Sequence, residues 1–357
     1  MARCSILNNY HPLPEWRPQD ACLIVWPHSH SDWEPRLDQI SEIYVDIARS
    51  ISDTQTVIIV YFDDRHKQYI QKLCINADCN MQALKFIEIK TNDTWVRDFG
   101  PQFLFSGKEF KYIDMEFHAW GKQYNYQLDN QFGKHLFRIF NQSAGKYTDV
   151  RFAIEGGNLD FNGRGALLTN LTSIRKNNPG ENYNDKYLAE RLISLFGINE
   201  LIAIDVDGLQ GDDTHGHIDT LARFISDDLI VYASTENSHN PNHGCLKDLE
   251  SQLNDCQANR YQLLPIQLPD KTISDGKGQI LPASYINFVF TNESLLVPIY
   301  NDDKDDVALD TFKELCPDRE VTGISASELI RQYGSLHCAT LHIPKNTIDE
   351  NWYRSAK

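Results

Sequence analysis

The chain has 357 residues and carries 50 Asp and Glu against 34 Lys and Arg, a formal net charge of −16. A protein that binds phosphate backbones needs a basic face, so this charge excludes nucleic acid as a partner. Hydrophobic residues make up 41% of the chain, but no apolar run of about 18 residues occurs, which predicts a globular protein without a membrane partner.

Short apolar runs rich in β-branched and aromatic residues predict strands along the whole chain. In chain order they cover residues 22–26, 56–62, 84–89, 102–105, 166–170, 229–233, 285–290, 295–299 and 339–343. Amphipathic stretches with helical spacing lie between several of them, at 37–51, 187–196, 246–253 and 307–315. The acidic residues 302–306 suit the start of the last helix. This alternation indicates an α/β protein and by itself fits a doubly wound parallel sheet.

Five motifs that carry polar, reactive residue types divide the chain at a steady interval. Their key residues are Asp98, Glu155, His217, Asn287 and Cys338, which are 57, 62, 70 and 51 residues apart. One such motif in each unit of about 50 to 70 residues, with each unit opening on a strand, predicts a propeller of mixed α/β blades. We then expect the motifs to meet at one end of a central channel. No low-complexity linker divides the chain, so residues 1–357 are predicted to form a single domain.

The eight cysteines are scattered along the chain and form no Cys-x-x-Cys pair. This distribution argues against a disulfide framework and against a zinc site. The first residues are polar rather than an apolar secretion segment, so a reducing cytoplasm is the expected location. Except for Cys338, the cysteines are expected to be small buried hydrophobic residues.

The residue types of the motifs suit an attack on a carbon inside a cation. Cys338 is the candidate nucleophile, and His217 is the candidate for the proton transfers. The carboxylates of Asp98, Glu155 and Asp219 can hold a positive group, whereas most cysteine hydrolases collect N–H donors for an oxyanion. A thiol among three acids therefore predicts a small cationic substrate with a guanidinium or amidinium group.

Each of the other motif residues has a functional and a structural interpretation. His217 and Asp219 are two residues apart and would share one face of a strand. Glu155 either orients His217 or touches the guanidinium directly. Trp95 either forms a wall of the pocket or packs in the core, and Asn287 either lines the channel or supports a turn.

Several segments resemble the signature blocks of the agmatine deiminase family, in the same order and over nearly the whole chain. They are Pro14-Glu15-Trp16, Val25-Trp26-Pro27-His28, Thr94-Trp95-Val96-Arg97-Asp98-Phe99-Gly100-Pro101, Glu155-Gly156-Gly157-Asn158, Gly211-Asp212-Asp213-Thr214-His215-Gly216-His217-Ile218-Asp219, Pro282-Ala283-Ser284-Tyr285-Ile286-Asn287-Phe288 and Gly334-Ser335-Leu336-His337-Cys338. The resemblance implies a five-bladed α/β propeller of the pentein superfamily, with ββαβ units around a central channel. It also implies a thiouronium intermediate on the cysteine, no metal and no cofactor.

The same resemblance implies the reaction and the substrate. Agmatine would be hydrolysed to N-carbamoylputrescine and ammonia, a step of putrescine and polyamine biosynthesis, by a homo-oligomer (dimer or tetramer). Agmatine ends in a primary ammonium, so an acid is expected at the far end of the pocket. Asp212 and Asp213 are the candidates, and Asp213 is favoured.

Three alternatives remain open. A peptidylarginine or free L-arginine deiminase of the same superfamily would need cationic partners for a carboxylate, and residues 117–122 hold one lysine and no arginine. A non-enzymatic propeller that binds a protein would lack the nucleophile. A zinc hydrolase would use His215, His217 and Asp219, with His337 and Cys338 as further ligands.

Overall fold

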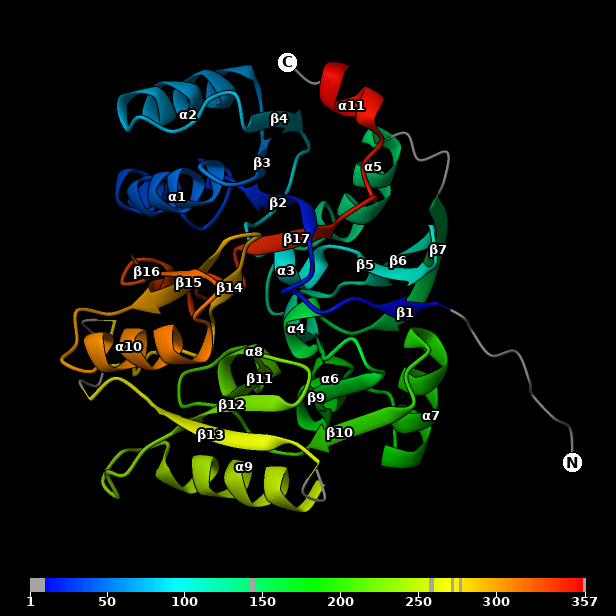
Figure 1. Ribbon diagram of the computed structural model, residues 1–357, viewed down its shortest axis with the longest axis vertical. Helices are drawn as coiled ribbons and strands as arrows, with labels where there is room; N and C mark the ends of the chain where they lie inside the picture. Colours follow the sequence, from blue (N-terminus) through cyan, green and yellow to red (C-terminus); the bar gives the residue numbers. More distant parts are fainter. Residues whose placement is uncertain (1–9, 141–144, 257–259, 271–272, 276–277, 356–357) are drawn as a thin grey trace, which may run out of the picture.

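The computed structural model describes residues 10–140, 145–256, 260–270, 273–275 and 278–355. Within these ranges the chain forms five separate sheets of three or four strands. Figure 1 shows the sheets arranged around the short helices α3 (Val96–Phe99) and α4 (Ala119–Lys122), with longer helices toward the outside. No helix of the described residues is long and apolar enough to span a bilayer.

The same pairing pattern recurs in every sheet. One strand pairs antiparallel with a second strand, and the second pairs in parallel with a third that follows a helical connection. A parallel neighbour requires such a crossover, so each helix is a consequence of the pairing. The sheets are, in spatial order, β1 (His11–Pro12), β5 (Gln102–Ser106), β6 (Glu109–Glu116) and β7 (Gly145–Ala153); β10 (Glu200–Ile204), β9 (Ala166–Asn170) and β8 (Asp160–Phe161); β11 (Ala222–Phe224), β12 (Leu229–Ser234) and β13 (Gln262–Gln267); β14 (Val289–Phe290), β15 (Ser294–Ile299) and β16 (Glu320–Ser325); and β17 (Thr340–Pro344), β2 (Gln19–Val25), β3 (Thr56–Tyr61) and β4 (Leu84–Glu88).

The last of these sheets contains strands from both ends of the chain. The C-terminal strand β17 pairs antiparallel with β2, with Thr340 opposite Ile24. β2 in turn pairs in parallel with β3, so this sheet has the same antiparallel and parallel pairs as the others. The first and last segments of the chain are therefore held together by backbone hydrogen bonds.

The helices follow from local signals in the sequence. α1 (Leu37–Ser52) buries the apolar positions Ile40, Ile43 and Ile47, which recur at helical spacing and face β3. α7 (Asp185–Phe196) begins after the N-cap Asn184 and ends at Gly197, which has a φ of 64°. The other helices are α2 (Asp64–Asn76), α5 (Phe132–Ile139), α6 (Leu171–Asn177), α8 (Ile218–Leu221), α9 (His243–Cys256), α10 (Asp305–Leu315) and α11 (Glu350–Ser355), and 3-10 turns cover Glu34–Arg36, Asp129–Gln131, Gly156–Asn158 and Leu329–Gln332.

Most of the predicted strands and helices are present. The prediction was wrong for residues 285–290, of which only Val289–Phe290 is a strand. Asn287 does not join a ladder because its side chain bonds to the backbone of Asp219 and of His337. The prediction that each motif opens a strand was also inexact, since Asp98, Glu155, His217 and Cys338 lie in turns or short helices that come just before β5, β8, β11 and β17.

The cysteines are mostly buried, as predicted, with two departures. Cys256 is exposed and Cys245 is half-buried, whereas Cys22, Cys74 and Cys316 are buried free thiols. Cys256 is the last residue of α9, and its thiol donates a hydrogen bond to the backbone carbonyl of Ala203 in β10 at 3.2 Å. Cys4 lies outside the described residues.

Asp305 ties the start of α10 to the segments around it. Its Oδ1 accepts hydrogen bonds from the hydroxyl of Tyr285 at 2.7 Å and from the backbone N of Tyr300 at 3.1 Å. Its Oδ2 accepts one from the backbone N of Asp302 at 3.0 Å. The acidic run therefore begins the helix, as predicted, and one of its acids is buried for this purpose.

We expect Asp305→Ala to lower the free energy of unfolding by about 3 kcal/mol, because buried donors lose a charged acceptor. The control is Asp306→Ala, an exposed position in the same helical turn, which should cost less than about 1 kcal/mol. Thermal and denaturant unfolding followed by circular dichroism would measure both. Equal losses in the two variants would contradict the role given to Asp305.

Candidate active site

The thiol of Cys338 lies against Asp219 and Asn287 in a buried site. Its Sγ is 3.6 Å from Oδ2 of Asp219 and 3.3 Å from Nδ2 of Asn287. The carboxamide oxygen of Asn287 accepts hydrogen bonds from the backbone N of His337 at 2.9 Å and of Cys338 at 3.4 Å. Asn287 therefore both faces the site and supports the turn that presents the thiol, so its two expected roles coexist.

His217 lies between two carboxylates that come from different motifs. Its Nδ1 is 3.5 Å from Oδ1 of Asp98, and its Nε2 is 3.6 Å from Oε2 of Glu155. Burial opposes the charged form, but the charges of Asp98 and then Glu155 outweigh it and raise the pKa of His217 to about 10. The ring is an imidazolium at neutral pH, with two N–H donors directed at acids.

The expected strand at His217 is absent. His217 precedes α8 and Asp219 lies in its first turn, because Gly216, with a φ of 91°, turns the chain just before them. The carboxylate of Asp212 stabilises this turn by accepting hydrogen bonds from the backbone N of Thr214 and of Gly216. Both His217 and Asp219 still reach the site, from a helical turn instead of a pleated strand.

Asp98 is held by two donors and is surrounded by other charges. Its Oδ1 accepts a hydrogen bond from the backbone N of Gly157 at 2.9 Å, and its Oδ2 accepts one from the indole of Trp120 at 3.0 Å. Burial, together with the charges of Asp219 and Glu155, raises the pKa of Asp98 to about 7, although the cation of His217 opposes this shift.

Asp219 is ionised and has one oxygen free. Burial alone would raise its pKa, but His337 outweighs burial and lowers the pKa of Asp219, because its Nδ1 lies 2.7 Å from Oδ2. Among the described residues, neither Oδ1 of Asp219 nor Oε1 of Glu155 has a hydrogen-bond partner, and both atoms are buried. Buried acceptors without donors are rare and mark a place that a donor-rich ligand can fill.

The same surroundings hold Cys338 in its protonated form. Burial is the largest cause, and the negative charges of Asp219 and Asp98 add to it, so the pKa of the thiol lies well above its usual value. The hydrogen bond from Asn287 favours the thiolate but does not reverse the shift. A cation placed between the acids and the sulfur would reverse it, by direct Coulomb attraction.

Gly157 is required for space and not for backbone freedom. A Cβ atom at this position would lie 2.6 Å from Oδ1 of Asp98, 2.8 Å from Nδ1 of His217 and 3.1 Å from Oδ2 of Asp219. The three side chains can converge only because residue 157 has no side chain. Gly156 is needed for space as well, since a Cβ atom there would lie 2.1 Å from the backbone O of Arg97.

A cavity of about 20 Å³ opens beside Cys338 and extends toward the predicted ammonium site. Its walls include Trp95, which also packs on Trp33 at a ring distance of 6.0 Å and so fills both of its expected roles. Asp213 lines the far side, where its Oδ2 accepts a hydrogen bond from the hydroxyl of Tyr124 at 3.0 Å. Burial and the neighbouring Asp212 raise the pKa of Asp213 to about 7.

Several residues that touch this site were not predicted from the sequence. Trp120 and Tyr124 belong to one loop, in which residues 119–122 all have positive φ values, and they contact Asp98 and Asp213. Glu15 and His337 lie behind the thiol. Their signal was present in the motifs, because Glu15 and His337 both belong to segments that carry the resemblance.

His215 and Arg97 do not line the cavity beside Cys338. His215 is half-buried with a φ of 62°. Arg97 points away from Asp98, toward Glu15 and His342. Among the described residues, no group of three or more His, Cys, Asp or Glu side chains has the geometry to hold a metal ion.

Comparison with known proteins places this site among related enzymes. A sequence profile of the Porphyromonas-type peptidyl-arginine deiminases matches residues 11–344. A Listeria monocytogenes protein named "Putative agmatine deiminase 2" is 26% identical over 94% of this chain and 95% of its own length. A substrate-bound agmatine deiminase of C. jejuni has a TM-score of 0.84 at 30% identity, over 94% of this chain and 96% of its own. An agmatine deiminase of Enterococcus faecalis, at 23% identity over 95% of this chain and 97% of its own, shares the fold with a TM-score of 0.86.

We expect nitrogen-15 spectra of the histidine rings to show His217 as an imidazolium at pH 8. Asp98→Asn should lower the pKa of His217 by about one unit or more, because it removes an opposite charge within about 4 Å. Asp114→Asn is the control, since Asp114 is a buried acid that bonds to Tyr147 and does not face His217. A neutral His217 ring at pH 8 in the unaltered protein would contradict the electrostatics described above.

Proposed function

The chain belongs to the Porphyromonas-type peptidyl-arginine deiminase family and is a hydrolase that acts on C–N bonds of amidines, and we propose that its substrate is agmatine. The products would be N-carbamoylputrescine and ammonia, a step toward putrescine and other polyamines. The five sheets with one pairing pattern support an arrangement as a five-bladed pentein propeller of ββαβ units. In this proposal residues 1–357 form one domain and the site lies in its central channel.

One observation carries the proposal: a buried thiol lies against Asp219, and buried carboxylate oxygens of Asp219 and Glu155 have no hydrogen-bond partner among the described residues. Oδ1 of Asp219 and Oε1 of Glu155 need donors, and a guanidinium supplies several N–H groups in one plane. Its positive charge would also relieve the repulsion that raises the pKa of Asp98. A neutral or anionic substrate would leave these buried acids unpaired, at a cost of several kcal/mol.

The first half of the reaction would form a covalent bond to sulfur. The bound cation favours loss of the thiol proton of Cys338 to solvent, and the thiolate Sγ then attacks the central carbon of the guanidinium. His217 donates a proton to the departing nitrogen, and ammonia leaves as the C–N bond breaks. The remaining group is a thiouronium on Cys338, which keeps the positive charge between Asp98 and Asp219.

The second half would use water and the same imidazole. His217 takes a proton from a water molecule that attacks the thiouronium carbon, and the C–S bond breaks to release the ureido product. A ring with a pKa of about 10 is a weak acid, but a cation beside it favours its neutral form and lowers that pKa. Glu155 would orient the ring through both halves, because its carboxylate faces Nε2.

The other end of the cavity suits an ammonium. Asp213 faces the cavity, and among the described residues the one side chain that donates a hydrogen bond to its carboxylate is Tyr124, through its hydroxyl. Its pKa is raised by burial and by the charge of Asp212, and a substrate ammonium beside it would lower this pKa and stabilise the carboxylate. Trp95 and Trp120 line the space between, where indole rings can pack on an alkyl chain.

The residues that line the cavity also favour agmatine over the alternative substrates. Free arginine and peptidylarginine bring a carboxylate or a peptide carbonyl, which requires cationic or N–H donors. Among the described residues that line the cavity there are four aspartates and no lysine or arginine. A carboxylate would therefore meet Asp213 at close range. A binding module without catalysis fits less well, because Cys338, His217 and the three acids are all in place.

The cavity must widen to admit its substrate. Its volume of about 20 Å³ holds one water molecule but not a guanidinium with an alkyl chain. Tyr333 and Gln332 border the cavity and are partly exposed, and Tyr333 has a strained φ of 67°. We assign the opening motion to this segment.

A homo-oligomeric state and a cytoplasmic location complete the proposal. The oligomeric state rests on the resemblance to the family, and the location rests on the scattered free thiols.

Agmatine should be hydrolysed at least about a hundredfold more efficiently than L-arginine, since a like-charge contact costs several kcal/mol and each 1.4 kcal/mol is tenfold. Asp213→Asn should raise the KM for agmatine about tenfold and narrow this ratio. Asp207→Asn, an exposed position, is the control. Ammonia release would be measured for the unaltered protein and both variants with agmatine, L-arginine and a peptide that ends in arginine. Equal kcat/KM values of the unaltered protein for agmatine and L-arginine would overturn the assignment.

Cys338→Ala should abolish turnover but leave agmatine binding measurable, because the carboxylates remain. His217→Ala should slow both halves of the reaction by at least about a hundredfold and accumulate the adduct. Intact-protein and peptide mass spectrometry after incubation with agmatine would locate it. Cys256→Ala, which removes an exposed thiol, should change neither turnover nor adduct. An adduct on any cysteine other than Cys338 would contradict the mechanism.

A further inference from the structure

Behind the thiol, one buried carboxylate from the N-terminal segment links three distant parts of the chain. Oε1 of Glu15 accepts a hydrogen bond from Arg97 at 3.2 Å, and Oε2 accepts a short one from Arg223. Oε2 also lies 3.3 Å from Nε2 of His337. Arg97 and His337 directly precede two of the site residues in the sequence. Glu15 thus contacts the immediate neighbours of the groups that face the substrate.

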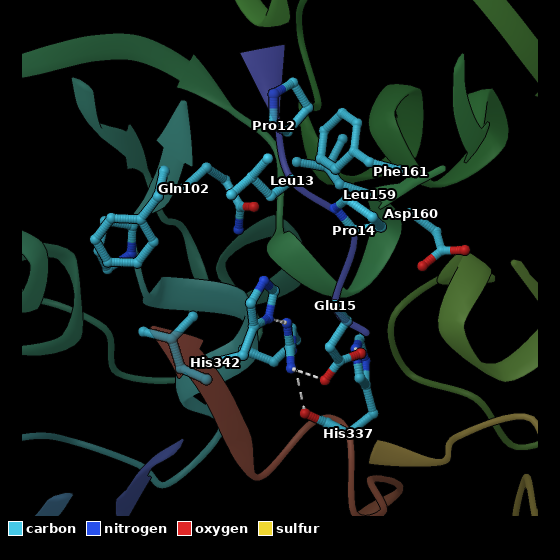
Figure 2. Close-up of a pocket in the computed structure, with 14 residues that line it drawn as sticks. Pro12, Leu13, Pro14, Glu15, Gln102, Leu159, Asp160, Phe161, His337 and His342 are labelled. Carbon is cyan, nitrogen blue, oxygen red and sulfur yellow. Dashed lines mark hydrogen bonds and ion pairs between the residues drawn. The ribbon is translucent and has the colours of Figure 1, made fainter. Parts of the chain in front are cut away.

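These contacts lie on the wall of a second small cavity, of about 20 Å³, which shares no lining residue with the one beside Cys338. Figure 2 shows Glu15 and His337 at this cavity, with Pro12, Leu13 and Pro14 running past it. Neither Glu15 nor His337 is reached by substrate in the mechanism above. Their effect on the reaction must therefore pass through other residues.

The ring of His337 is fixed on both sides. Its Nδ1 lies 2.7 Å from Oδ2 of Asp219, and its Nε2 faces Glu15. Its backbone is fixed as well, since the N donates to Asn287 and the carbonyl accepts from Nε of Arg97 at 3.3 Å. Because the carboxylate of Asp219 can only accept, Nδ1 donates to it, and the ring cannot turn without losing this bond or the contact of Nε2 with Glu15.

This arrangement selects which oxygen of Asp219 faces the substrate. His337 occupies Oδ2, so Oδ1 is the oxygen without a partner. Oδ2 is also the atom 3.6 Å from Sγ of Cys338. The hydrogen bond from His337 therefore offsets part of the negative charge on the carboxylate oxygen nearest to the sulfur, and this reduces the repulsion that a thiolate would meet.

The cost of the arrangement argues for a functional role. Burial of Glu15 opposes its charge, but the cations of Arg223, His337 and Arg97 hold its pKa well below the ordinary value, so it stays ionised. Buried ionic groups of this kind contribute little to stability, because desolvation offsets most of their attraction. An apolar contact would hold these segments together as well, but it could not orient an imidazole.

We propose that His337 and Glu15 are positioning residues for the reaction: Glu15 orients the ring of His337, and His337 orients Asp219 and supports the thiolate of Cys338. The part of this inference that concerns turnover rests on the proposed function, whereas the part that concerns the thiol does not. The charged and titratable groups that face His337 or Cys338 from all packed elements are Glu15, Tyr44, Arg97, Asp98, Asp160, His217, Asp219, Arg223, Tyr300 and His342.

The first test measures alkylation of Cys338 by iodoacetamide without substrate, as a function of pH, in the unaltered protein and in His337→Gln. Peptide mass spectrometry follows the Cys338 peptide, with the exposed Cys256 as an internal reference. At neutral pH, alkylation of Cys338 in His337→Gln should be about tenfold slower, with the profile moved up by about one unit, because one pKa unit reduces the thiolate tenfold. In Glu15→Gln the pH profile of Cys338 alkylation should move in the same direction, but by less than in His337→Gln.

A merely structural role predicts the opposite result. A loosened site would expose Cys338, lower its pKa and speed alkylation. The matched control is Asp114→Asn, which replaces a buried carboxylate that accepts a hydrogen bond from Tyr147 and is not among the groups that face His337 or Cys338. Its alkylation profile should be unchanged. Unchanged or faster alkylation in His337→Gln would overturn the proposal.

The second test is a double-mutant cycle on turnover of agmatine. His337→Gln and Glu15→Gln should each lower kcat about tenfold or more, since a small misplacement of reacting groups has effects of this size. The double variant should lose no more than His337→Gln alone, because Glu15 acts through His337. If the fold decrease in kcat of the double variant equals the product of the two single decreases, Glu15 does not act through His337.

The two tests fail in different ways. If agmatine is not turned over by the unaltered protein, the proposed function is wrong, and alkylation still decides whether His337 supports the thiolate. If Glu15→Gln does not fold, Glu15→Asp replaces it, because it keeps the charge and withdraws the carboxylate by one methylene from His337. That variant should slow alkylation of Cys338, and an unaltered rate would count against the link.

Discussion

Repulsion among buried carboxylates is the constraint on which the rest of this structure depends. Asp98, Glu155 and Asp219 converge on one imidazole in a place from which solvent is excluded, so their charges are weakly screened. The protein distributes donors among them, with the backbone of Gly157 and the indole of Trp120 on Asp98. It does not satisfy all of them, and the remaining acceptors determine what can bind.

This imbalance connects recognition to reactivity. In the site as described, burial and the nearby acids keep Cys338 protonated, and the acids keep His217 charged although burial opposes its charge. A cation bound among the acids would change both groups toward the forms that react, by the same Coulomb interaction. Activation that depends on the ligand protects a thiol from alkylation and oxidation while the site is free of substrate.

The fold follows from local patterns to a large extent. Eight of the nine predicted strand positions coincide with strands, because apolar runs of four to seven residues suit a buried sheet. The exception, at 285–290, is instructive: Asn287 forms contacts with residues from two other motifs, and these outweigh the β-propensity of its neighbours. Local propensity decides a segment only where no distant partner competes for its polar groups.

For the site, the sequence by itself determined which residue types occur and that they recur in ordered motifs, and so it predicted a thiol, an imidazole and acids for a cation. Only the tertiary structure decided how these groups are paired. His217 is matched with Asp98 and Glu155, and Asp219 is matched with His337, across more than 50 residues of chain in each case. Such pairings depend on which turns meet at the ends of the sheets, and spacing along a chain cannot specify a contact between segments that fold separately and then pack.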